Sequence, residues 1–455
     1  MTIVRRRLLQ GLGGAAAAGA AGLGAALGLA PAGGRAAQDD YRAIVVLFLM
    51  GGNDGHNTLV PMDAGHADYE RARQNLALPR DSLAALPGQA GGRSFGLHPA
   101  LAPLVPLYAQ QRLAFIANAG PLVAPITALQ ARNAEGDLPP FLLSHSDQVA
   151  IQQGWTVRDD SSGWGGRALE LLPRDLRHPL AAVSLSGELT LVRGHRSTVA
   201  FLPTDGAPRT FGLADLLQPQ DPRTQAVDQI AQWQSRNRYE ADYARNWGQS
   251  LSDSRLLTRT IESAANPPQD FGSGELAERL RRLAAVLPVF KSQGYRRQVF
   301  LVSWGMFDTH ATQRGSGITT QDTQLAAVGK AAAAFDAANR ANGMEQDVIT
   351  LMMSDFGRTV RPGSGGGSEH AWGNHWFAFG GPVAGGTVVG SFPSPELGGP
   401  DDGDPNFNGR HVPTIATDQV GATLATWLGL PAASLHEVFP DLVNFTQKSI
   451  ALLHR

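Results

Sequence analysis

The sequence contains no cysteine among its 455 residues. This absence excludes disulfide bonds, thiolate metal sites and cysteine nucleophiles. Neither sign of charge is in large excess, because the formal net charge at pH 7 is −2. With no excess of positive charge, nothing indicates a nucleic-acid partner.

Three common catalytic signatures are also missing. The chain has no GxxxxGK[ST] phosphate loop, no Gly-x-Ser-x-Gly nucleophile elbow and no HExxH zinc helix. A glycine-rich run at 363–367 does not directly follow an expected strand, so it is a poor candidate for a dinucleotide site. Beyond the first 37 residues, no apolar stretch is long enough to cross a bilayer.

The first 37 residues have the three-part layout of an export signal. Arg5 and Arg6 open a twin-arginine pattern, and a stretch rich in Ala, Gly and Leu follows from 11 to about 32. We expect cleavage near Ala36 after export by the Tat translocase, and a periplasmic or secreted mature protein without a stable membrane span. The alternative is a membrane anchor, which the weakly apolar composition disfavours.

Short apolar runs alternate with helix-like segments along 38–455, which we expect to form one domain. Such runs are typical of strands buried on both faces of a parallel sheet. They occur at 43–50, 113–117, 180–185, 298–303, 348–353 and 376–379. Helical spacing of apolar residues occurs at 101–111, 274–287, 320–342 and 417–428. The alternation predicts an α/β fold, a three-layer sandwich around a central, mostly parallel sheet. A polar, mostly helical insertion is expected around 222–266.

Carboxylates and imidazoles gather where the expected strands end. Asp54 follows the first strand, Asp308 and His310 follow the strand near 300, and Asp355 follows the strand near 350. His370 lies shortly before the strand near 378. Ligands of open α/β sheets bind beyond the carboxyl ends of the strands. Each residue alone is an ordinary turn or loop residue, but together they predict a divalent-metal site.

At these positions the chain resembles a family of Tat-exported bacterial proteins, domain of unknown function 1501, which is related to sulfatases and alkaline phosphatases. The resemblance covers nearly the whole mature chain. Its motifs are Met50–Asn57, Leu97–Pro99, Ser144-His145, Phe307–His310, Ser354–Thr359 and Glu369–His375. It implies an alkaline-phosphatase-like sandwich and metal ligands at Asp54, Asp308, His310, Asp355 and His370.

The resemblance also has a gap. Phe356 stands where the superfamily has a histidine after the aspartate, which puts a standard two-zinc site in doubt. His375 or Asn53 would compensate for the missing imidazole. We therefore expect one or two divalent ions, with zinc or manganese favoured over calcium by the mixed Asp and His ligands.

The segment that begins at Ser144 has the form of the superfamily's nucleophile segment. Ser144 stands at the start of an expected helix, and Gly154 follows ten positions later, much as in sulfatases. The helix N-terminus would direct backbone N–H groups at an anion, and a metal would help to ionise the hydroxyl. The alternative is that Ser144 or Ser146 only caps the helix. Without cysteine, a formylglycine would have to come from serine.

Two further side chains have catalytic interpretations. Arg358 would bind a sulfate or phosphate oxygen in bidentate fashion, or would pair structurally with Asp355. His145 would be the acid that protonates the leaving group, or an ordinary loop histidine.

These observations predict an exported metal-dependent hydrolase of sulfate or phosphate esters. Its substrate would be a small-molecule or polysaccharide anionic ester. One alternative is a non-catalytic exported protein that keeps the fold and binds a metal or ligand. Another is a structural surface component that works with a partner. Metal content separates the first two from the third, and turnover separates the first from the second.

Overall fold

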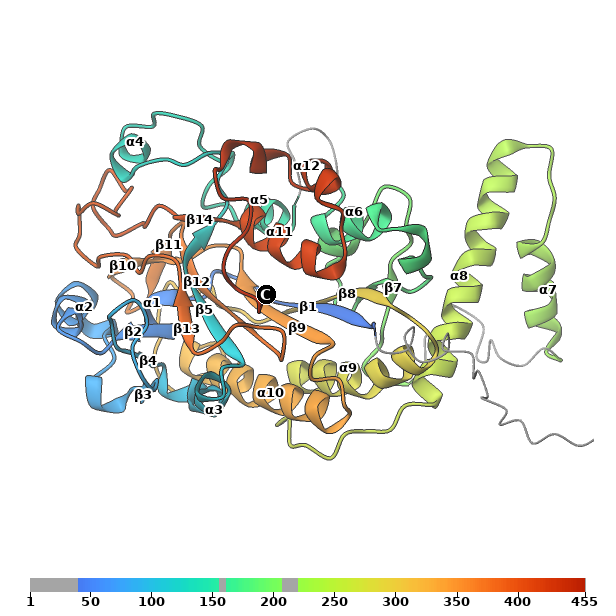
Figure 1. Ribbon diagram of the computed structural model, residues 1–455, viewed down its shortest axis with the longest axis horizontal. Coiled ribbons are helices and arrows are strands. Elements are labelled where there is room, and N and C mark those ends of the chain that lie inside the picture. The colour runs from blue at the N-terminus through green and yellow to red at the C-terminus, as the bar shows by residue number, and fades with distance from the viewer. Residues whose placement is uncertain (1–39, 155–160, 207–219, 455) are drawn as a thin grey trace, which may run out of the picture.

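The computed structural model describes residues 40–154, 161–206 and 220–454 (Figure 1). The expected signal peptide lies outside these ranges. A nine-stranded sheet runs through the molecule in the order β13-β5-β12-β9-β1-β8-β6-β7, and β14 pairs with β5. Its strands are β1 (Arg42–Leu49), β5 (Leu113–Gly120), β6 (Ala182–Ser184), β7 (Ala200–Phe201), β8 (Arg297–Trp304), β9 (Val348–Ser354), β12 (Asn374–Phe379), β13 (Thr387–Val389) and β14 (Ile415–Ala416).

The sheet is mostly parallel, as predicted. Only β12 runs antiparallel to its neighbours, which are β5 and β9. The other strand pairs of this sheet are parallel, including both pairs made by the central β1.

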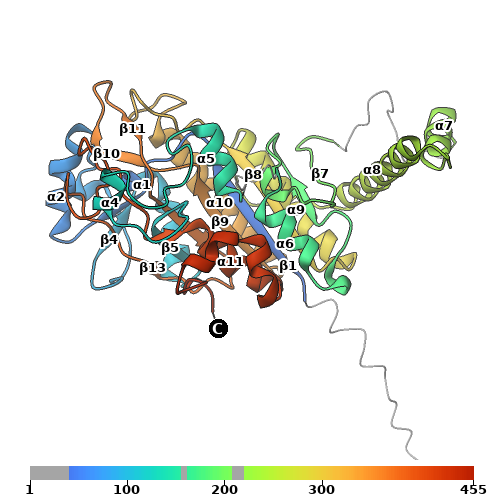
Figure 2. The same ribbon diagram turned by 90° about the horizontal axis from the view of Figure 1, so that it is seen from above.

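Helices cover both faces of the sheet, which makes the predicted three-layer sandwich (Figures 1 and 2). Successive residues of a strand point to opposite faces, so Val45 and Leu47 enter one core and Ile44 and Val46 the other. The first core is closed by α9 (Glu275–Ser292) and α10 (Gln321–Ala341). The second is closed by α6 (Trp164–Leu171), α11 (Thr417–Leu428) and α12 (Leu435–Val438).

Smaller elements surround the sandwich. They are α1 (Gly55–Thr58), α2 (Gly65–Arg73), α3 (Val105–Ala109), α4 (Ala128–Arg132), α5 (His145–Gln152), the sheet β2 (Leu59–Pro61), β4 (Phe95–Leu97) and β3 (Ala84–Ala85), and the pair β10 (Arg358–Pro362) and β11 (Ser368–His370). The helix expected at 101–111 is a 3-10 segment over Pro99–Leu104 followed by α3. Proline at 103 and 106 prevents regular α-helical bonding across this stretch.

A hairpin of two helices, α7 (Pro222–Ala231) and α8 (Arg238–Glu262), projects from the sandwich (Figures 1 and 2). Both lie within the stretch 222–266, where a helical insertion is expected. Among the described residues, no helix combines the length and the apolar character needed to span a membrane.

The register of the sheet places three loops side by side. Leu49 at the end of β1 pairs with Trp304 of β8 on one side and with Ser354 of β9 on the other. The chain segments that leave β1, β8 and β9 therefore emerge together at the carboxyl edge of the sheet. The first of them turns at Gly51 and Gly52, whose φ angles of 102° and 73° are in the left-handed region.

The tight packing of this edge gives a stability prediction. A Cβ on Gly52 would lie 2.6 Å from the ring of Phe356, whereas a Cβ on Gly88 would meet no atom within 4 Å. Both glycines have similar positive φ values, 73° and 79°. We expect Gly88→Ala to lower the free energy of unfolding by about 1 kcal/mol through backbone strain alone. Gly52→Ala should cost about 2–4 kcal/mol, because steric overlap adds to the strain. Equal losses in urea unfolding would contradict the packing argument.

Candidate metal centre

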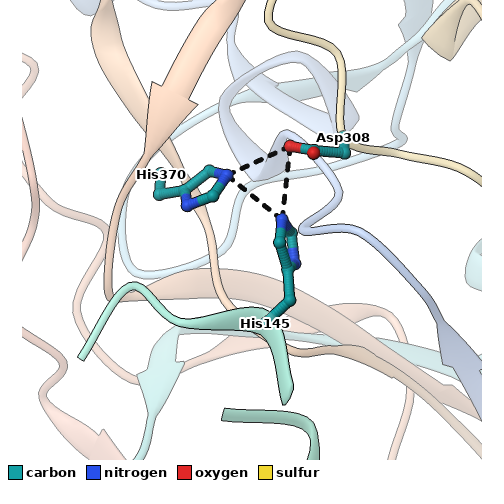
Figure 3. A group of neighbouring side chains, drawn as sticks. All are labelled: His145, Asp308 and His370. Atoms are coloured by element: carbon teal, nitrogen blue, oxygen red, sulfur yellow. Dashed lines mark hydrogen bonds and ion pairs between the residues drawn. The ribbon is translucent and has the colours of Figure 1, made fainter. Parts of the chain in front are cut away.

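Four side chains converge at the carboxyl edge of the sheet. His145 begins α5, Asp308 and His310 follow β8, and His370 ends β11. The Asp308 Oδ1 atom lies 3.3 Å from Nε2 of His145, 2.9 Å from Nε2 of His310 and 3.1 Å from Nε2 of His370. Figure 3 shows that His145, Asp308 and His370 direct these atoms toward one another. The group is only partly buried, so it is open to solvent.

The second nitrogen of each imidazole contacts an oxygen acceptor. His145 Nδ1 lies 2.6 Å from Oδ2 of Asp355, and His310 Nδ1 lies 2.7 Å from Oε2 of Glu369. His370 Nδ1 lies 2.8 Å from the carbonyl oxygen of Leu143. Carboxylates and carbonyls only accept hydrogen bonds, so each Nδ1–H donates to its oxygen acceptor. Each Nε2 faces Asp308, which is also an acceptor: it donates to that carboxylate when protonated and offers a lone pair to a cation when deprotonated, as in metal sites whose histidines are oriented by outer carboxylates.

The spacing of these lone pairs fits a cation. Nε2 of His370 lies 3.1 Å from Nε2 of His145 and 2.9 Å from Nε2 of His310. At such distances a protonated Nε2 donates to an unprotonated one, and two unprotonated nitrogens can share a cation. Ligand atoms about 2.0–2.1 Å from a tetrahedral zinc ion are about 3.4 Å apart, only slightly more than here. His145, Asp308 and His370 place ligand atoms that all lie within 4.8 Å of one another, and His310 adjoins this group through Asp308 and His370. Imidazole and carboxylate donors suit zinc or manganese.

The backbone just before α5 is strained at Leu143, whose carbonyl contacts the candidate metal centre. Leu143 has φ 72°, a left-handed conformation that is uncommon for a residue with a side chain. In this conformation its carbonyl reaches His370. Strain of this kind costs about 1–3 kcal/mol and concentrates at functional sites.

Phe356 fills the space beside two of the imidazoles. Its ring centroid lies 4.6 Å from that of His145 and 4.7 Å from that of His370. The residue is buried and supplies no ligand atom. At the position where a histidine was expected, this chain therefore has an apolar ring that packs against two of the imidazoles.

Asp355 is placed behind the ligands and not among them. Its Oδ1 accepts from the backbone N–H of Gly52 and from the Ser354 hydroxyl, 3.0 Å away. Its Oδ2 accepts from the N–H of Gly51 at 3.2 Å and from His145. Asp355 was expected to be a metal ligand, but it instead orients the candidate ligand His145.

Arg358 is fully buried and its donors all point into the protein. Nε donates to the carbonyl of Gly52 at 2.8 Å, and Nη1 to that of Ser368 at 3.0 Å. Nη2 donates to the carbonyls of Gly51 and Phe307 and, at 2.5 Å, to Oδ1 of Asp308. The structure therefore gives Arg358 a structural ion pair with Asp308. It does not form the expected pair with Asp355, and each of its three nitrogens donates to an acceptor within the protein.

The structure does not bring Asp54 into the centre. Its Oδ1 caps α1 by accepting from the N–H groups of His56 and Asn57, 3.0 and 3.4 Å away. Its Oδ2 accepts from Gln313 at 2.6 Å and forms an ion pair with Arg73 in which both side chains are fully buried. Both oxygens are therefore engaged in holding the first loop, which corrects the expectation of a metal ligand.

His375 lies in a different, buried group of histidines. Its Nδ1 accepts from the N–H of Asn118, 3.0 Å away at an irregularity in the β5–β12 pairing. Its ring stacks on Phe392, with centroids 4.6 Å apart, and packs edge-on against His56 at 5.7 Å. His411 packs against the other side of His56 at 5.0 Å. The structure therefore separates His375 from the other predicted ligands.

Ser144 immediately precedes the ligand His145 and occupies the N-cap position of α5. Its hydroxyl does not cap the helix but donates to the carboxylate of Asp147. Ser146 is exposed, and its hydroxyl lies 3.4 Å from that of Ser144. The simple capping interpretation does not describe Ser144, whose hydroxyl is hydrogen-bonded to a potential proton acceptor.

The ionisation of the centre follows from these contacts. Burial raises the pKa of Asp308, but the hydrogen bond and charge of Arg358 outweigh it and hold that pKa well below its usual range. The hydrogen bond to Asp355 raises the pKa of His145, because the carboxylate favours imidazolium. Burial lowers the pKa of His370. The carboxylate of Asp308 is therefore anionic at physiological pH.

Sequence reasoning missed Glu369 and the carbonyl of Leu143 as partners of the imidazoles. Glu369 stands directly before His370, inside a motif already singled out, and a carboxylate beside a candidate ligand is a usable signal. No sequence signal marks the Leu143 carbonyl, because every residue has a backbone carbonyl.

The fold and the centre define this class of protein: an α/β sandwich with an Asp- and His-lined candidate metal site at the carboxyl edge of its sheet. The chain belongs to the family described as protein of unknown function, DUF1501, which matches residues 41–405. Among curated proteins, none matches the chain.

Several solved structures are similar in fold. A sulfatase from Pseudoalteromonas sp. is 8% identical with a TM-score of 0.34, and the match covers 90% of this chain and 73% of that one. A phosphonate monoester hydrolase from Silicibacter pomeroyi is 9% identical with a TM-score of 0.34, covering 86% and 74%. The lipoteichoic acid synthase of Listeria monocytogenes is 9% identical with a TM-score of 0.35, covering 90% and 76%. At such low identity these structures say nothing about reactivity, so the possible chemistry of the site follows from the residues that form it.

The buried position of His375 gives a prediction on acid stability. Burial lowers its pKa to about 3 in the folded protein, whereas the unfolded chain titrates near 6.5. Between these values the unfolded chain binds more protons, so stability is lost as the pH falls below about 6.5. At pH 5 this group should cost about 2 kcal/mol relative to pH 8.

Urea unfolding at pH 8 and pH 5 measures this loss. His375→Gln should remove that part of the pH dependence, while His436→Gln, a change at an exposed histidine, should leave it in place. Identical pH dependence in the two variants would show that His375 titrates normally.

Proposed function

We propose that this protein is an exported, divalent-metal-dependent hydrolase of sulfate or phosphate esters. The observation that carries the proposal is the convergence of three imidazole Nε2 atoms on one carboxylate oxygen at a solvent-accessible strand edge. Imidazole nitrogens and a carboxylate oxygen are the donors that a site for zinc or manganese uses. Open α/β sheets bind ligands at this edge.

The residues take two kinds of role. His145, His310, His370 and Asp308 would hold the ion. Asp355, Glu369 and the Leu143 carbonyl orient the three imidazoles. A bound divalent ion supplies Lewis-acid chemistry: it neutralises charge on the ester and favours ionisation of a nearby hydroxyl. His145, expected to be an acid, becomes a ligand in this proposal.

Ser144 is the proposed nucleophile. Its Oγ donates to Asp147, which would take the proton as Oγ forms a bond to sulfur or phosphorus. The bond from sulfur or phosphorus to the substrate's alcohol oxygen would break, and that oxygen would take up a proton and leave as the alcohol. Water would then hydrolyse the ester on Ser144, which restores the hydroxyl and releases inorganic sulfate or phosphate. Backbone N–H groups in the first turn of α5 favour an anion on the same side as the metal ligand His145.

A second candidate function is favoured by Arg358. Each nitrogen of its fully buried guanidinium donates within the protein, so Arg358 is not placed to stabilise a substrate anion. A protein that keeps the fold and binds a metal or a ligand without turnover would have this feature. Metal content without hydrolysis of any ester would support this alternative.

Removing single ligands tests the metal centre. Wild-type protein should contain about one equivalent of zinc or manganese after dialysis. His145→Ala, His370→Ala and Asp308→Ala should each weaken metal binding by about 10–100-fold or more, as loss of even an outer partner does. Plasma mass spectrometry measures the content, and the exposed His436→Ala is the matched control. A wild-type protein that stays metal-free after incubation with zinc and manganese contradicts the proposal.

Replacing Ser144 and Ser146 one at a time tests which of the two serines is the nucleophile. We expect Ser144→Ala to reduce kcat for an aryl sulfate or aryl phosphate ester by about 10³-fold or more, because the covalent route is lost. Its metal content should not change. Ser146→Ala, a change of the exposed serine two residues away, should keep kcat within about twofold. The reverse pattern would assign the nucleophile to Ser146.

Export by the twin-arginine route and a periplasmic or secreted location complete the proposal. Replacing Arg5 and Arg6 together with lysine should leave the full-length precursor in the cytoplasm. The wild-type chain should appear outside it, shortened by about 36 residues. Cell fractionation with mass spectrometry measures both, and export of the double variant at the wild-type level would rule out this route.

A further inference from the structure

The projecting hairpin of α7 and α8 has a small apolar core of its own. Val227 and Ala231 of α7 pack with Trp247 and Leu251 of α8, and Leu251 is buried. This contact holds α7 against α8, since an amphipathic helix is stabilised mainly by the packing of its apolar stripe. Apolar residues of the hairpin that lie outside this cluster therefore need a different explanation.

Four large apolar side chains of the hairpin are exposed to solvent. The exposed fractions are 47% for Ile230, 59% for Trp233, 85% for Tyr239 and 63% for Tyr243. Every other tryptophan or tyrosine in the described part of the chain is buried or half-buried. Exposed apolar side chains that gather in one segment, rather than singly over the surface, mark an interaction site.

Three of these side chains lie around the free end of the hairpin. The loop that joins α7 to α8 is at the end of the hairpin away from the sandwich (Figures 1 and 2). Ile230 is in the last turn of α7, Trp233 is in the loop, and Tyr239 is in the first turn of α8. We call residues 230–239 the hairpin tip.

The tip also carries unpaired positive charge. Arg236 and Arg238 are exposed, and residues 229–239 include no aspartate or glutamate. Within the described ranges neither of these arginines forms an ion pair, whereas Arg223, Arg245 and Arg255 of the same hairpin each pair with an aspartate. Positive charge is therefore left without a counterpart beside the exposed apolar side chains.

This combination is complementary to the surface of an anionic bilayer. Tryptophan and tyrosine favour the boundary between acyl chains and headgroups, where the ring is apolar and its polar atom stays hydrated. Guanidinium groups bind phosphate oxygens and are attracted by anionic headgroups. A fluid lipid surface also accepts side chains on a projecting end, whereas a protein partner would need a cavity of matching shape.

We propose that the hairpin tip docks the protein on a bilayer that contains anionic phospholipids. Trp233 and Tyr239 enter the headgroup region, and Arg236 and Arg238 contact lipid phosphates. The strands β10 and β11, which carry His370, lie at the opposite end of the molecule from the hairpin (Figure 1). A chain docked in this way keeps its candidate metal centre away from the lipid. The proposal does not depend on hydrolase activity.

Co-sedimentation with lipid vesicles tests the proposal. Protein of residues 38–455, which lacks the expected signal peptide, is mixed with vesicles of phosphatidylcholine and phosphatidylglycerol in equal parts, or of phosphatidylcholine alone. Binding to the anionic vesicles should be at least about tenfold tighter, because two arginines face the charged surface. Raising the salt concentration from about 0.1 M to about 1 M should weaken this binding, since it shortens the range of the attraction.

Variants at the tip assign the binding to it. Arg236→Gln combined with Arg238→Gln should weaken binding to anionic vesicles by about tenfold or more. Trp233→Ala should weaken it by about fivefold or more, because an interfacial ring is lost. The matched control for charge is Arg80→Gln combined with Arg259→Gln, a change of two exposed arginines outside the tip. This control should bind within about twofold of the wild type.

Ile318→Ala is the control for the loss of an exposed apolar side chain, because Ile318 is 86% exposed and lies outside the hairpin. Urea unfolding should be the same in all variants, since the altered side chains face solvent. Equal binding to both kinds of vesicle, or tip variants that bind like the wild type, would overturn the proposal. So would dimers in sedimentation velocity that Trp233→Ala abolishes, in a chain that binds no vesicles, because the tip would then be a contact between copies.

Discussion

The buried guanidinium of Arg358 is the interaction on which the carboxyl edge of the sheet depends. It bonds the carbonyls of Gly51 and Gly52 after β1, of Phe307 after β8, and of Ser368 in β11. A buried charge is tolerated only when it is paired and hydrogen-bonded, and Asp308 supplies the pair. The same bond that neutralises Arg358 fixes the carboxylate around which the imidazoles gather. The contact between Arg358 and Asp308 therefore supports both the fold of the sheet edge and the candidate metal site.

A second set of contacts builds outward from this anchor. Asp355 accepts from two backbone N–H groups of the β1 loop and from His145, so it joins the sheet edge to α5. Leu143, whose backbone is strained, places its carbonyl against His370 and so joins the start of α5 to β11. α5 is thereby held between two residues that touch the candidate ligands. The candidate ligand His145 and Ser144 are therefore held together at the start of this short helix.

Much of the fold was predictable because parallel strands leave an unmistakable pattern. Strands such as β1 and β9 are buried on both faces, so their sequences are continuous apolar runs. Residues that follow such strands meet at one edge, where Asp308 lies. His370 comes before β12, which runs antiparallel to its neighbours, so it reaches the same edge and lies 3.1 Å from Asp308. Strand length was less predictable: β6 is only Ala182–Ser184, since Leu180 has φ 56° and cannot continue a strand.

The direction of each side chain was not predictable from the same pattern. Asp54 follows a strand as expected, but Arg73, nineteen residues later, turns its carboxylate away from the centre. Asp355 is near the centre, yet it faces the outer nitrogen of an imidazole and orients a ligand. His145 was undervalued because its place depends on where α5 docks, a contact across 210 residues that local periodicity does not encode.

X-ray absorption at the zinc edge, together with anomalous diffraction from crystals of zinc-loaded protein, tests the central claim most directly. The account predicts one anomalous peak between His145, His310, His370 and Asp308. The first shell should contain three imidazole nitrogens and one carboxylate oxygen at about 2.0–2.1 Å. A peak at Asp54 or at the buried His56, His375 and His411 group, or no peak at all, would contradict it.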